Sequence, residues 1–425
     1  MLALAAGVSA PIAAALLLVG VILPSSDELG LLARSGHCLG RTVHLVTRGR
    51  VHAARCGQRG CRGWSFAARE RETPAAHAMK DCAVMKVLII GGTVFLGRAL
   101  VDEALGRGHE VTLFNRGVSG PAPSGAESVK GDRENEAALR TLVDGRYWDA
   151  VIDTCGFEPR TVRLSARILA AHATAYAFVS SFHAYADWPA KGVDESFPRH
   201  QCPPDAGPDD VAYNALKAGC ERAVEESFPE RALIINPGII MGPGENVGRL
   251  PWWLETIARG GRVLAPGAPD RRMQLIDARD IARFVFDRLA AQGSGRYVTS
   301  GIPGNTTMGD LLRDCVRVTG ADTELVWADE SFLQERNIAP WSELPLWAPD
   351  IPEMAGIWQA SSQKALAAGL RCRPVSETVA DTWRALRSGE YPAPKYLQGK
   401  VPVGLDQAKH DAVLAEWDAR RPLGS

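Results

Sequence analysis

Two short motifs in this chain combine residue types that could do chemistry. An apolar run over 86–90 ends in the glycine turn Gly91-Gly92-Thr93-Val94-Phe95-Leu96-Gly97, and apolar residues then recur at helical spacing. A strand, a glycine turn and a helix N-terminus in this order form a cradle for phosphate, because backbone N–H groups and the helix dipole converge there on an anion. Farther along, Tyr213 and Lys217 are four residues apart, so they lie on one face of a helix. The two motifs in this order point to an enzyme that uses a nicotinamide dinucleotide.

The elements that must position these motifs alternate along the chain, as a parallel sheet requires. The sequence predicts strands over 86–90, 110–115, 128–130, 150–153, 175–180 and 232–236. It predicts helices between them, over 97–107, 134–142, 159–171 and 211–228. We therefore expect an α/β fold, a Rossmann doubly wound parallel sheet, with its dinucleotide-binding domain over 85–241.

The composition of the sequence changes after Asn236-Pro237-Gly238. Proline and glycine are frequent over 242–269, and most of the 11 tryptophans lie between 188 and 358. Further strands are expected at 295–301 and 324–329, and a helix at 309–319. This pattern predicts a smaller C-terminal substrate lobe over 242–387, interleaved with the last strands of the sheet. Its aromatic residues would either stack on a ring of the substrate or form the core of the lobe. A tail over 388–425 carries a helix at 405–419.

The first 84 residues form an N-terminal extension with a different composition. Residues 1–26 carry no charge and are mostly apolar, which is long enough to cross a bilayer, and an Arg-rich stretch follows. Three interpretations stay open: a start assigned upstream of the native one, with Met79 and Met85 as alternatives, a membrane anchor, or a signal peptide that lacks a basic n-region. We expect a cytoplasmic enzyme, anchored with its catalytic part facing the cytoplasm if residues 1–26 are native.

Charge and cysteine content limit the classes of partner. The chain has 425 residues and a formal net charge of −1, with its basic excess before residue 85 and its acidic excess after it. An acidic catalytic portion argues against nucleic acid as the partner and leaves a small molecule as the expected substrate. The set His37, Cys38, His44, His52, Cys56 and Cys61 matches no spacing typical of a metal site, so no metal is predicted.

The glycine turn together with Tyr213 and Lys217 resembles the extended and atypical branches of the short-chain dehydrogenase/reductase superfamily, the NAD(P)-dependent epimerase/dehydratase family. The resemblance covers about 85–387. It implies hydride transfer at a carbinol or carbonyl carbon, with a nucleotide sugar or another small alcohol or ketone as substrate. Reductase, epimerase and dehydratase all stay open, and so does the oligomeric state. The alternative is a non-catalytic dinucleotide-binding or RNA-binding protein of the same fold.

The resemblance also implies roles for three catalytic residues. Tyr213 would carry the hydroxyl proton, and Lys217 together with the positive nicotinamide ring would lower the pKa of that phenol. Lys217 would also hold the nicotinamide ribose. Ser181, four residues before Tyr185, would hydrogen-bond the reacting oxygen, with Ser180 as the second choice. We expect His183 to be a packing residue.

Cofactor-binding residues follow from the same resemblance. Gly91 and Gly97 match the outer glycines of the turn, and Val94 stands where the family has its middle glycine. The predicted cofactor-binding set is Gly91, Gly92, Thr93, Val94, Phe95, Leu96, Gly97, Asn115, Arg116, Asp132 and Lys217.

Cofactor preference depends on the end of the second strand. NAD-selective relatives place an acid there, whereas this chain has Asn115 followed by Arg116, a cation that can pair with a 2′-phosphate. We therefore expect NADP, with NAD as the alternative. Asp132 would lie on the adenine side. Two further departures are Cys155, expected as a half-buried thiol or a neighbour of the cofactor, and Asn236, where relatives often have arginine.

Overall fold

The computed structural model describes residues 42–47, 50–55, 84–391, 394 and 403–420. The chain divides into two compact units, of which Gly30–Val84 is one. In that unit β1 (Thr42–Thr47) pairs antiparallel with β2 (Arg50–Arg55). The apolar stretch 1–26 and the residues His37, Cys38, Cys56 and Cys61 lie outside the described residues. None of the helices that the structure describes is long and apolar enough to cross a membrane.

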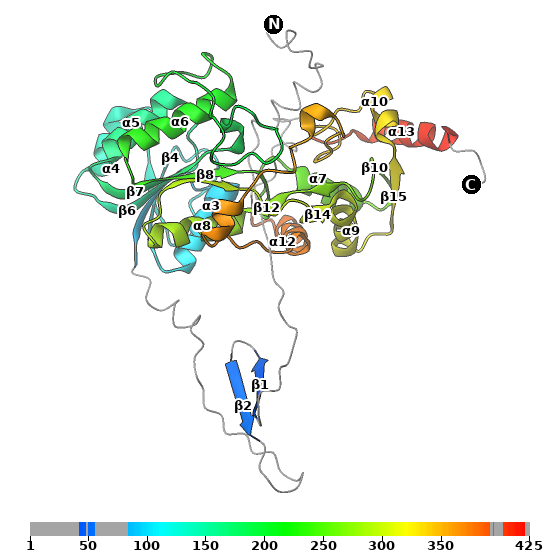
Figure 1. Ribbon diagram of the computed structural model, residues 1–425, viewed down its shortest axis with the longest axis horizontal. Helices are drawn as coiled ribbons and strands as arrows, with labels where there is room; N and C mark the ends of the chain where they lie inside the picture. The colour runs from blue at the N-terminus through cyan, green and yellow to red at the C-terminus, as the bar shows by residue number, and fades with distance from the viewer. Residues whose placement is uncertain (1–41, 48–49, 56–83, 392–393, 395–402, 421–425) are drawn as a thin grey trace. The chain divides into compact units, whose positions relative to one another are not determined.

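A seven-stranded parallel sheet forms the centre of the other unit (Figure 1). Its strands, in sheet order, are β13 (Gly295–Thr299), β8 (Ala232–Pro237), β7 (Ala173–Val179), β6 (Trp148–Asp153), β3 (Lys86–Ile90), β4 (Glu110–Asn115) and β5 (Glu127–Lys130). The order confirms the predicted doubly wound fold, and each predicted strand of the sheet is present with its ends shifted by a residue or two. The order reverses between β3 and β6, where an open parallel sheet forms a ligand crevice beyond its carboxyl ends.

Helices cover both faces of the sheet, which explains why its strands are apolar without alternation. On one face lie α3 (Phe95–Gly106) and α8 (Ala278–Ala290). On the other lie α4 (Glu136–Val143), α5 (Pro159–Leu169) and α6 (Tyr213–Ser227). Successive side chains of β3 point to opposite faces of the sheet. Val87 and Ile89 pack with α3 and α8, whereas Leu88 and Ile90 lie in the core shared with α4, α5 and α6.

Most of the remaining elements build a second lobe beside the sheet, whereas the segment 363–367 packs against β13 and in the core that α3 and α8 share with the sheet. The remaining elements are η2 (Phe182–Ala184), β9 (Ile239–Met241), α7 (Arg249–Ile257), β10 (Gly261–Pro266), β11 (Arg272–Met273), β12 (Leu275–Asp277), β14 (Thr306–Thr307), α9 (Met308–Thr319), β15 (Thr323–Ala328), α10 (Glu330–Glu335), η3 (Pro352–Met354), α11 (Gln363–Ala367), α12 (Val375–Ser388) and α13 (Gln407–Arg420). The strands pair as β9 with β12, β10 with β15 and β11 with β14. The helix expected at 405–419 is observed as α13.

Most of the tryptophans of this lobe form its core. Trp252, Trp253, Trp341 and Trp347 are buried in one hydrophobic cluster. The indole N–H of Trp253 donates to the carbonyl oxygen of Pro345 at 2.8 Å, which ties α7 to the segment that follows α10. Most of these tryptophans therefore pack in the core of the lobe, which is one of the two interpretations that the sequence left open.

A buried ion pair fixes the carboxyl end of the sheet at the point where its strand order reverses. Asp153, the last residue of β6, is fully buried and pairs through both oxygens with the guanidinium of Arg133, at 2.7 Å each. The Tyr176 hydroxyl donates to the same carboxylate at 2.9 Å, and Arg133 also donates to the hydroxyl of Ser165 at 2.7 Å. Burial alone would raise the pKa of Asp153, but the charge and hydrogen bonds of Arg133 bring it below its ordinary value.

Replacement of Asp153 by asparagine should destabilise the protein strongly, because it leaves a buried guanidinium without its counter-ion. We expect Asp153→Asn to lose roughly 3–5 kcal/mol of unfolding free energy at neutral pH. A carboxylate with a lowered pKa stabilises the fold above its unfolded pKa of about 4 and stops doing so as the pH falls through its folded value. Urea unfolding at several pH values should therefore show the deficit shrinking in acid.

The matched control for this variant is Asp149→Asn, at an exposed position on the same strand. It should cost far less. Equal losses for the two variants would contradict the structural role assigned to the pair.

Candidate functional site

The glycine turn joins β3 to α3 at the carboxyl edge of the sheet. Gly91 and Gly92 have φ angles of 102° and 86°, a region that favours glycine. A Cβ atom on Gly91 would collide with Oγ1 of Thr154. A Cβ on Gly97 would lie 3.1 Å from the backbone nitrogen of Gly92, so the helix packs directly on the turn. The chain therefore needs glycine at these positions for its own geometry.

The N-terminus of α3 is free to bind an anion. Its first residue is Phe95, and Val94 before it has an extended backbone and caps no N–H group with its side chain. The first-turn N–H groups of a helix have no partner within the helix, and they favour negative charge. Val94 is half-buried and does not line the adjoining cavity. The residues present therefore fit the phosphate groups of a dinucleotide, even with valine in place of the middle glycine.

A cavity of about 260 Å³ opens beside this turn. It is lined by Ile90, Gly91, Thr93, Phe114, Asn115, Arg116, Gly117, Val118, Ser119, Gly131, Asp132, Arg133, Glu134, Cys155 and Phe157. Five predicted cofactor residues meet here, namely Gly91, Thr93, Asn115, Arg116 and Asp132. The other residues of the turn do not line the cavity: Gly92, Phe95, Leu96 and Gly97 are buried.

The end of β4 presents no carboxylate to this cavity. The Asn115 side chain donates to the carbonyl oxygen of Gly91 at 2.9 Å and accepts from the N–H of Gly117 at 2.9 Å. Arg116 is exposed and makes no hydrogen bond or ion pair within the part of the chain that the structure describes. Asp132 is half-buried and accepts from the N–H of Glu134 at 3.0 Å.

Ten of the 15 residues that line the cavity were not predicted as cofactor-binding, and three of them bear on the chemistry of the site. Arg133 follows the predicted Asp132 directly, but its burial with Asp153 has no sequence signal. Cys155, which the sequence left undecided, lines the cavity with its sulfur 3.7 Å from the Arg133 guanidinium. Burial raises the pKa of this thiol, so it stays protonated at neutral pH. Phe157 connects the cavity to α6, because its ring lies 5.6 Å from the Lys217 ammonium.

Tyr213 and Lys217 occupy the first turns of α6. The Tyr213 hydroxyl is buried and has no hydrogen-bond partner among the described residues. Burial raises the pKa of this phenol, whereas we expected Lys217 to lower it. In this structure the Lys217 ammonium donates to two backbone carbonyls, of Gly156 at 2.8 Å and of Val179 at 2.9 Å. Burial lowers the pKa of Lys217, and this ammonium is almost completely enclosed.

The serine segment follows β7 and packs against α6. Ser181 is buried, and its hydroxyl accepts from the N–H of His183 at 3.2 Å. The Ser180 hydroxyl instead donates to the buried carboxylate of Glu221 at 2.5 Å. The hydroxyl of Ser180 is therefore bound to a carboxylate of α6, whereas that of Ser181 contacts only a backbone N–H of its own segment among the bonds described. The structure thus puts Ser181, Tyr213 and Lys217 on two elements in contact, at the edge that carries the glycine turn.

His183 is buried, as expected for a packing residue. Its ring lies against Trp188 with centroids 3.9 Å apart. Burial lowers the pKa of His183 to about 3, although the side chain of Asn214 opposes part of this shift. The imidazole is therefore neutral at physiological pH.

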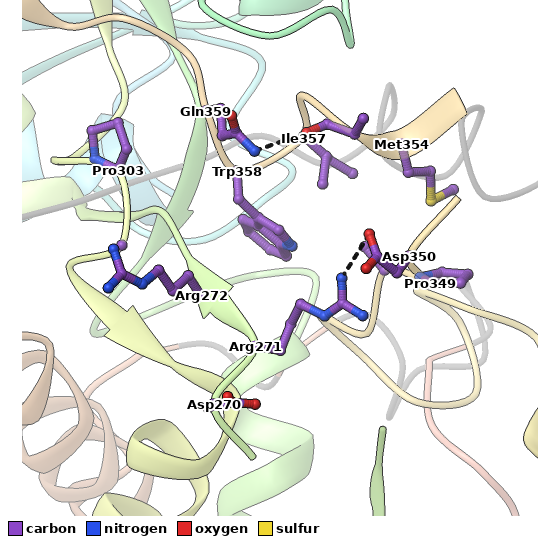
Figure 2. A pocket seen from close by; sticks show the side chains of 13 residues that line it. Asp270, Arg271, Arg272, Pro303, Pro349, Asp350, Met354, Ile357, Trp358 and Gln359 are labelled. Atoms are coloured by element: carbon purple, nitrogen blue, oxygen red, sulfur yellow. Dashed lines mark hydrogen bonds and ion pairs between the residues drawn. The ribbon is translucent and has the colours of Figure 1, made fainter. Parts of the chain in front are cut away.

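A second cavity, of about 600 Å³, lies in the smaller lobe. Arg271, Arg272, Asp350 and Trp358 all line it, and Trp358 lies between Arg272 and Asp350 in the view of Figure 2. Arg271 pairs with Asp350 at 3.1 Å and with Glu330 at 2.9 Å. The indole N–H of Trp358 is buried and has no hydrogen-bond partner within the described segments. Sequence analysis suggested aromatic stacking in this lobe but named none of these residues as a site.

The wall of this cavity touches the segment that follows Ser181. The N–H of Gly192 donates to the carbonyl oxygen of Gln359 at 2.8 Å, and the N–H of Ser361 donates to that of Val193 at 2.8 Å. Two backbone hydrogen bonds therefore join the two segments.

Comparison with known proteins gives matches at the level of family and fold. No curated protein matches the chain. Many solved structures do, among them WbmH of Bordetella bronchiseptica in complex with NAD+, with 17% identity, a TM-score of 0.54, and coverage of 72% of this chain and 98% of that one. UDP-glucose 4-epimerase of Thermotoga maritima with UDP-glucose matches with 17% identity, a TM-score of 0.53, and coverage of 72% and 100%.

The family model extends from the first strand of the sheet to its last. The model of the NAD dependent epimerase/dehydratase family matches residues 87–298, which run from β3 into β13. This range holds the glycine turn, the serine segment and α6. The chain therefore belongs to the NAD dependent epimerase/dehydratase family, as its sequence predicted, and is a nicotinamide-dependent enzyme.

Proposed function

We propose that this enzyme transfers hydride between NADP(H) and a carbinol or carbonyl carbon of a nucleotide-linked sugar or a similar small alcohol or ketone. The observation that supports the proposal is the contact between the segment that begins at Ser181 and the helix that carries Tyr213 and Lys217, within the family's matched range. The three residues come from two elements, the loop after β7 and the first turns of α6.

In this proposal each side chain has one task. The Tyr213 hydroxyl is protonated and has no partner in the described structure, so it can give its proton to a developing alkoxide. The Ser181 hydroxyl donates a hydrogen bond to the same oxygen. Lys217, held by the carbonyls of Gly156 and Val179, would hold the nicotinamide ribose and add positive charge to the site. The nicotinamide, when bound, supplies or accepts the hydride.

The smaller lobe supports an anionic, ring-bearing substrate. The second cavity offers the exposed guanidinium of Arg272, the paired guanidinium of Arg271 and the free N–H of Trp358. A phosphate accepts hydrogen bonds from such donors, and a flat ring packs on an indole. The Thermotoga protein was solved with UDP-glucose, a ligand of this kind. We therefore place the nucleotide-linked sugars first among the substrates to test.

Cofactor preference follows from the end of β4. Asn115 is neutral and its side chain is hydrogen-bonded to backbone groups, and Arg116 is exposed without a partner in the described part of the chain. The end of β4 therefore offers a 2′-phosphate a cation and no carboxylate, although Asp132 and Glu134, from the segment after β5, line the same cavity. Because the solved relatives include complexes with NAD, NAD is the competing assignment.

Tyr213→Phe should abolish most of the turnover and leave the fold and cofactor affinity intact. The ring still packs, but the proton carrier is gone, so kcat should fall roughly 10²–10⁴-fold. Lys217→Ala should reduce both kcat and cofactor affinity. The assay follows oxidation of NADPH with a panel of ketones and keto nucleotide sugars, and an isomerisation assay covers nucleotide sugars. If Tyr213→Phe turns over as fast as the parent, the mechanism is refuted, and a binding protein of the same fold becomes the better account.

Arg116→Ala should narrow the preference for NADP(H) over NAD(H). A charge-assisted hydrogen bond to phosphate contributes roughly 1.5–3 kcal/mol, so the ratio of the two dissociation constants should fall by about one to two orders of magnitude. Fluorescence titration of both cofactors measures the ratio. Arg140→Ala, which removes an exposed arginine from α4, is the control and should leave the ratio unchanged. Equal affinity of the parent for NAD(H) and NADP(H) would show that Arg116 does not select the cofactor.

A further inference from the structure

Glu221 is a fully buried carboxylate on the helix that carries Tyr213 and Lys217. The three residues are spaced by four, so they follow one face of α6. No role for Glu221 was expected from its place in the sequence. A buried carboxylate is strongly destabilising unless charge and hydrogen bonds compensate it, so its partners show what it does.

One oxygen of Glu221 joins the ends of two neighbouring strands. It accepts from the Ser180 hydroxyl at 2.5 Å, just beyond β7, and from the Asn236 side-chain amide at 2.5 Å, in β8. The same Asn236 amide group donates to the carbonyl oxygen of Ser181 at 3.1 Å. Ser181 is thus tied to Glu221 from both sides, through the preceding residue and through Asn236.

The other oxygen of Glu221 provides the charge balance. It accepts from the Arg199 guanidinium at 2.9 Å, and Arg199 also donates to Glu225, one turn later on α6, at 2.9 Å. Arg199 closes the loop that begins after Ser181, because it forms an antiparallel bridge with Tyr185. The ion pair therefore holds both ends of this loop against α6.

Asn236 determines this arrangement. Its side-chain oxygen accepts from the Tyr185 hydroxyl at 3.3 Å, while its amide group serves Glu221 and Ser181. Because Asn236 is neutral, it cannot balance the charge of the Glu221 carboxylate. Arg199, from a different segment of the chain, provides that charge instead.

We propose that Glu221 is a positioning residue, which fixes Ser181 relative to Tyr213 and Lys217. The inference rests on the proposed function for the role of Ser181. A catalytic hydroxyl displaced by about 1 Å can lose on the order of 10²-fold in rate. Glu221 acts through Ser180 and Asn236 and does not touch the reacting atoms.

The test compares Glu221→Gln with Glu225→Gln. Both variants remove one carboxylate that pairs with Arg199, but only Glu221 contacts Ser180 and Asn236. For Glu221→Gln we expect kcat to fall on the order of 10²-fold, with KM and the dissociation constant of NADPH within about threefold of the parent. Glu225→Gln should keep kcat within about twofold.

A double-mutant cycle separates positioning from stability. Asn236→Ala removes the link between Glu221 and the Ser181 carbonyl while keeping the ion pair. If Glu221 acts through Asn236, the double variant Glu221→Gln/Asn236→Ala should be hardly slower than Glu221→Gln alone. The proposal would be overturned if the kcat losses of the two single variants multiply in the double variant. It would also be overturned if Glu221→Gln lowers the Tm but keeps the kcat of the parent. An equal loss of kcat in Glu225→Gln would also overturn it, because charge alone would then be the cause.

Hydrogen exchange gives a readout that needs no substrate. In peptides covering 180–188, Glu221→Gln should exchange faster than the parent, and Glu225→Gln should not. If the exchange rate of these peptides is the same in Glu221→Gln and in the parent, the inference is contradicted, even if no compound of the panel is turned over. If Glu221→Gln does not fold, Asn236→Ala is used in this measurement instead. Tyr213→Phe, assayed in parallel, separates the two failures: full turnover there removes the proposed function, whereas loss there with full turnover in Glu221→Gln removes only the positioning role.

Discussion

The burial of two opposite charges on one face of α6 is the constraint on which the candidate site depends. An ammonium and a carboxylate cannot stay away from water without partners, and both find them at the carboxyl edge of the sheet. Lys217 binds the carbonyls of Gly156, after β6, and Val179, at the end of β7. Glu221 binds groups at the ends of β7 and β8. The helix that begins with Tyr213 is thereby held to the carboxyl ends of three adjacent strands, β6, β7 and β8.

The strand order explains why the site lies where it does. The sheet reverses between β3 and β6, where Ile90 pairs with Asp153. The glycine turn follows Ile90, and the Arg133–Asp153 pair closes the floor beside it. A dinucleotide that enters at the turn would cross this reversal to reach α6. The smaller lobe adds a cavity whose wall is joined to the loop after Ser181.

Much of the fold could be predicted from the sequence, because periodicity and glycine placement report on local structure. The strand at 86–90 and the helix after it can be predicted from the spacing of apolar residues within a short stretch of neighbouring sequence. Ion pairs between distant segments leave no such trace. In the sequence nothing distinguishes these residues from other charged ones, and only the fold pairs Arg133 with Asp153 and Arg199 with Glu221. The enclosure of Tyr213 could not be predicted either, because its spacing from Lys217 does not reveal that burial raises the pKa of the phenol or that the ammonium binds backbone carbonyls.

The most direct test of the account is the ionisation of Tyr213 with and without cofactor. The ultraviolet absorbance of phenolate in the parent, minus that of Tyr213→Phe, isolates this one side chain during a pH titration. Burial predicts that the protein alone keeps the phenol protonated beyond the free value of about 10. Saturating NADP+ should shift the titration to lower pH, since a positive nicotinamide beside Lys217 stabilises the phenolate. A titration that is the same with and without NADP+ would contradict the placement of Tyr213 at the reacting centre.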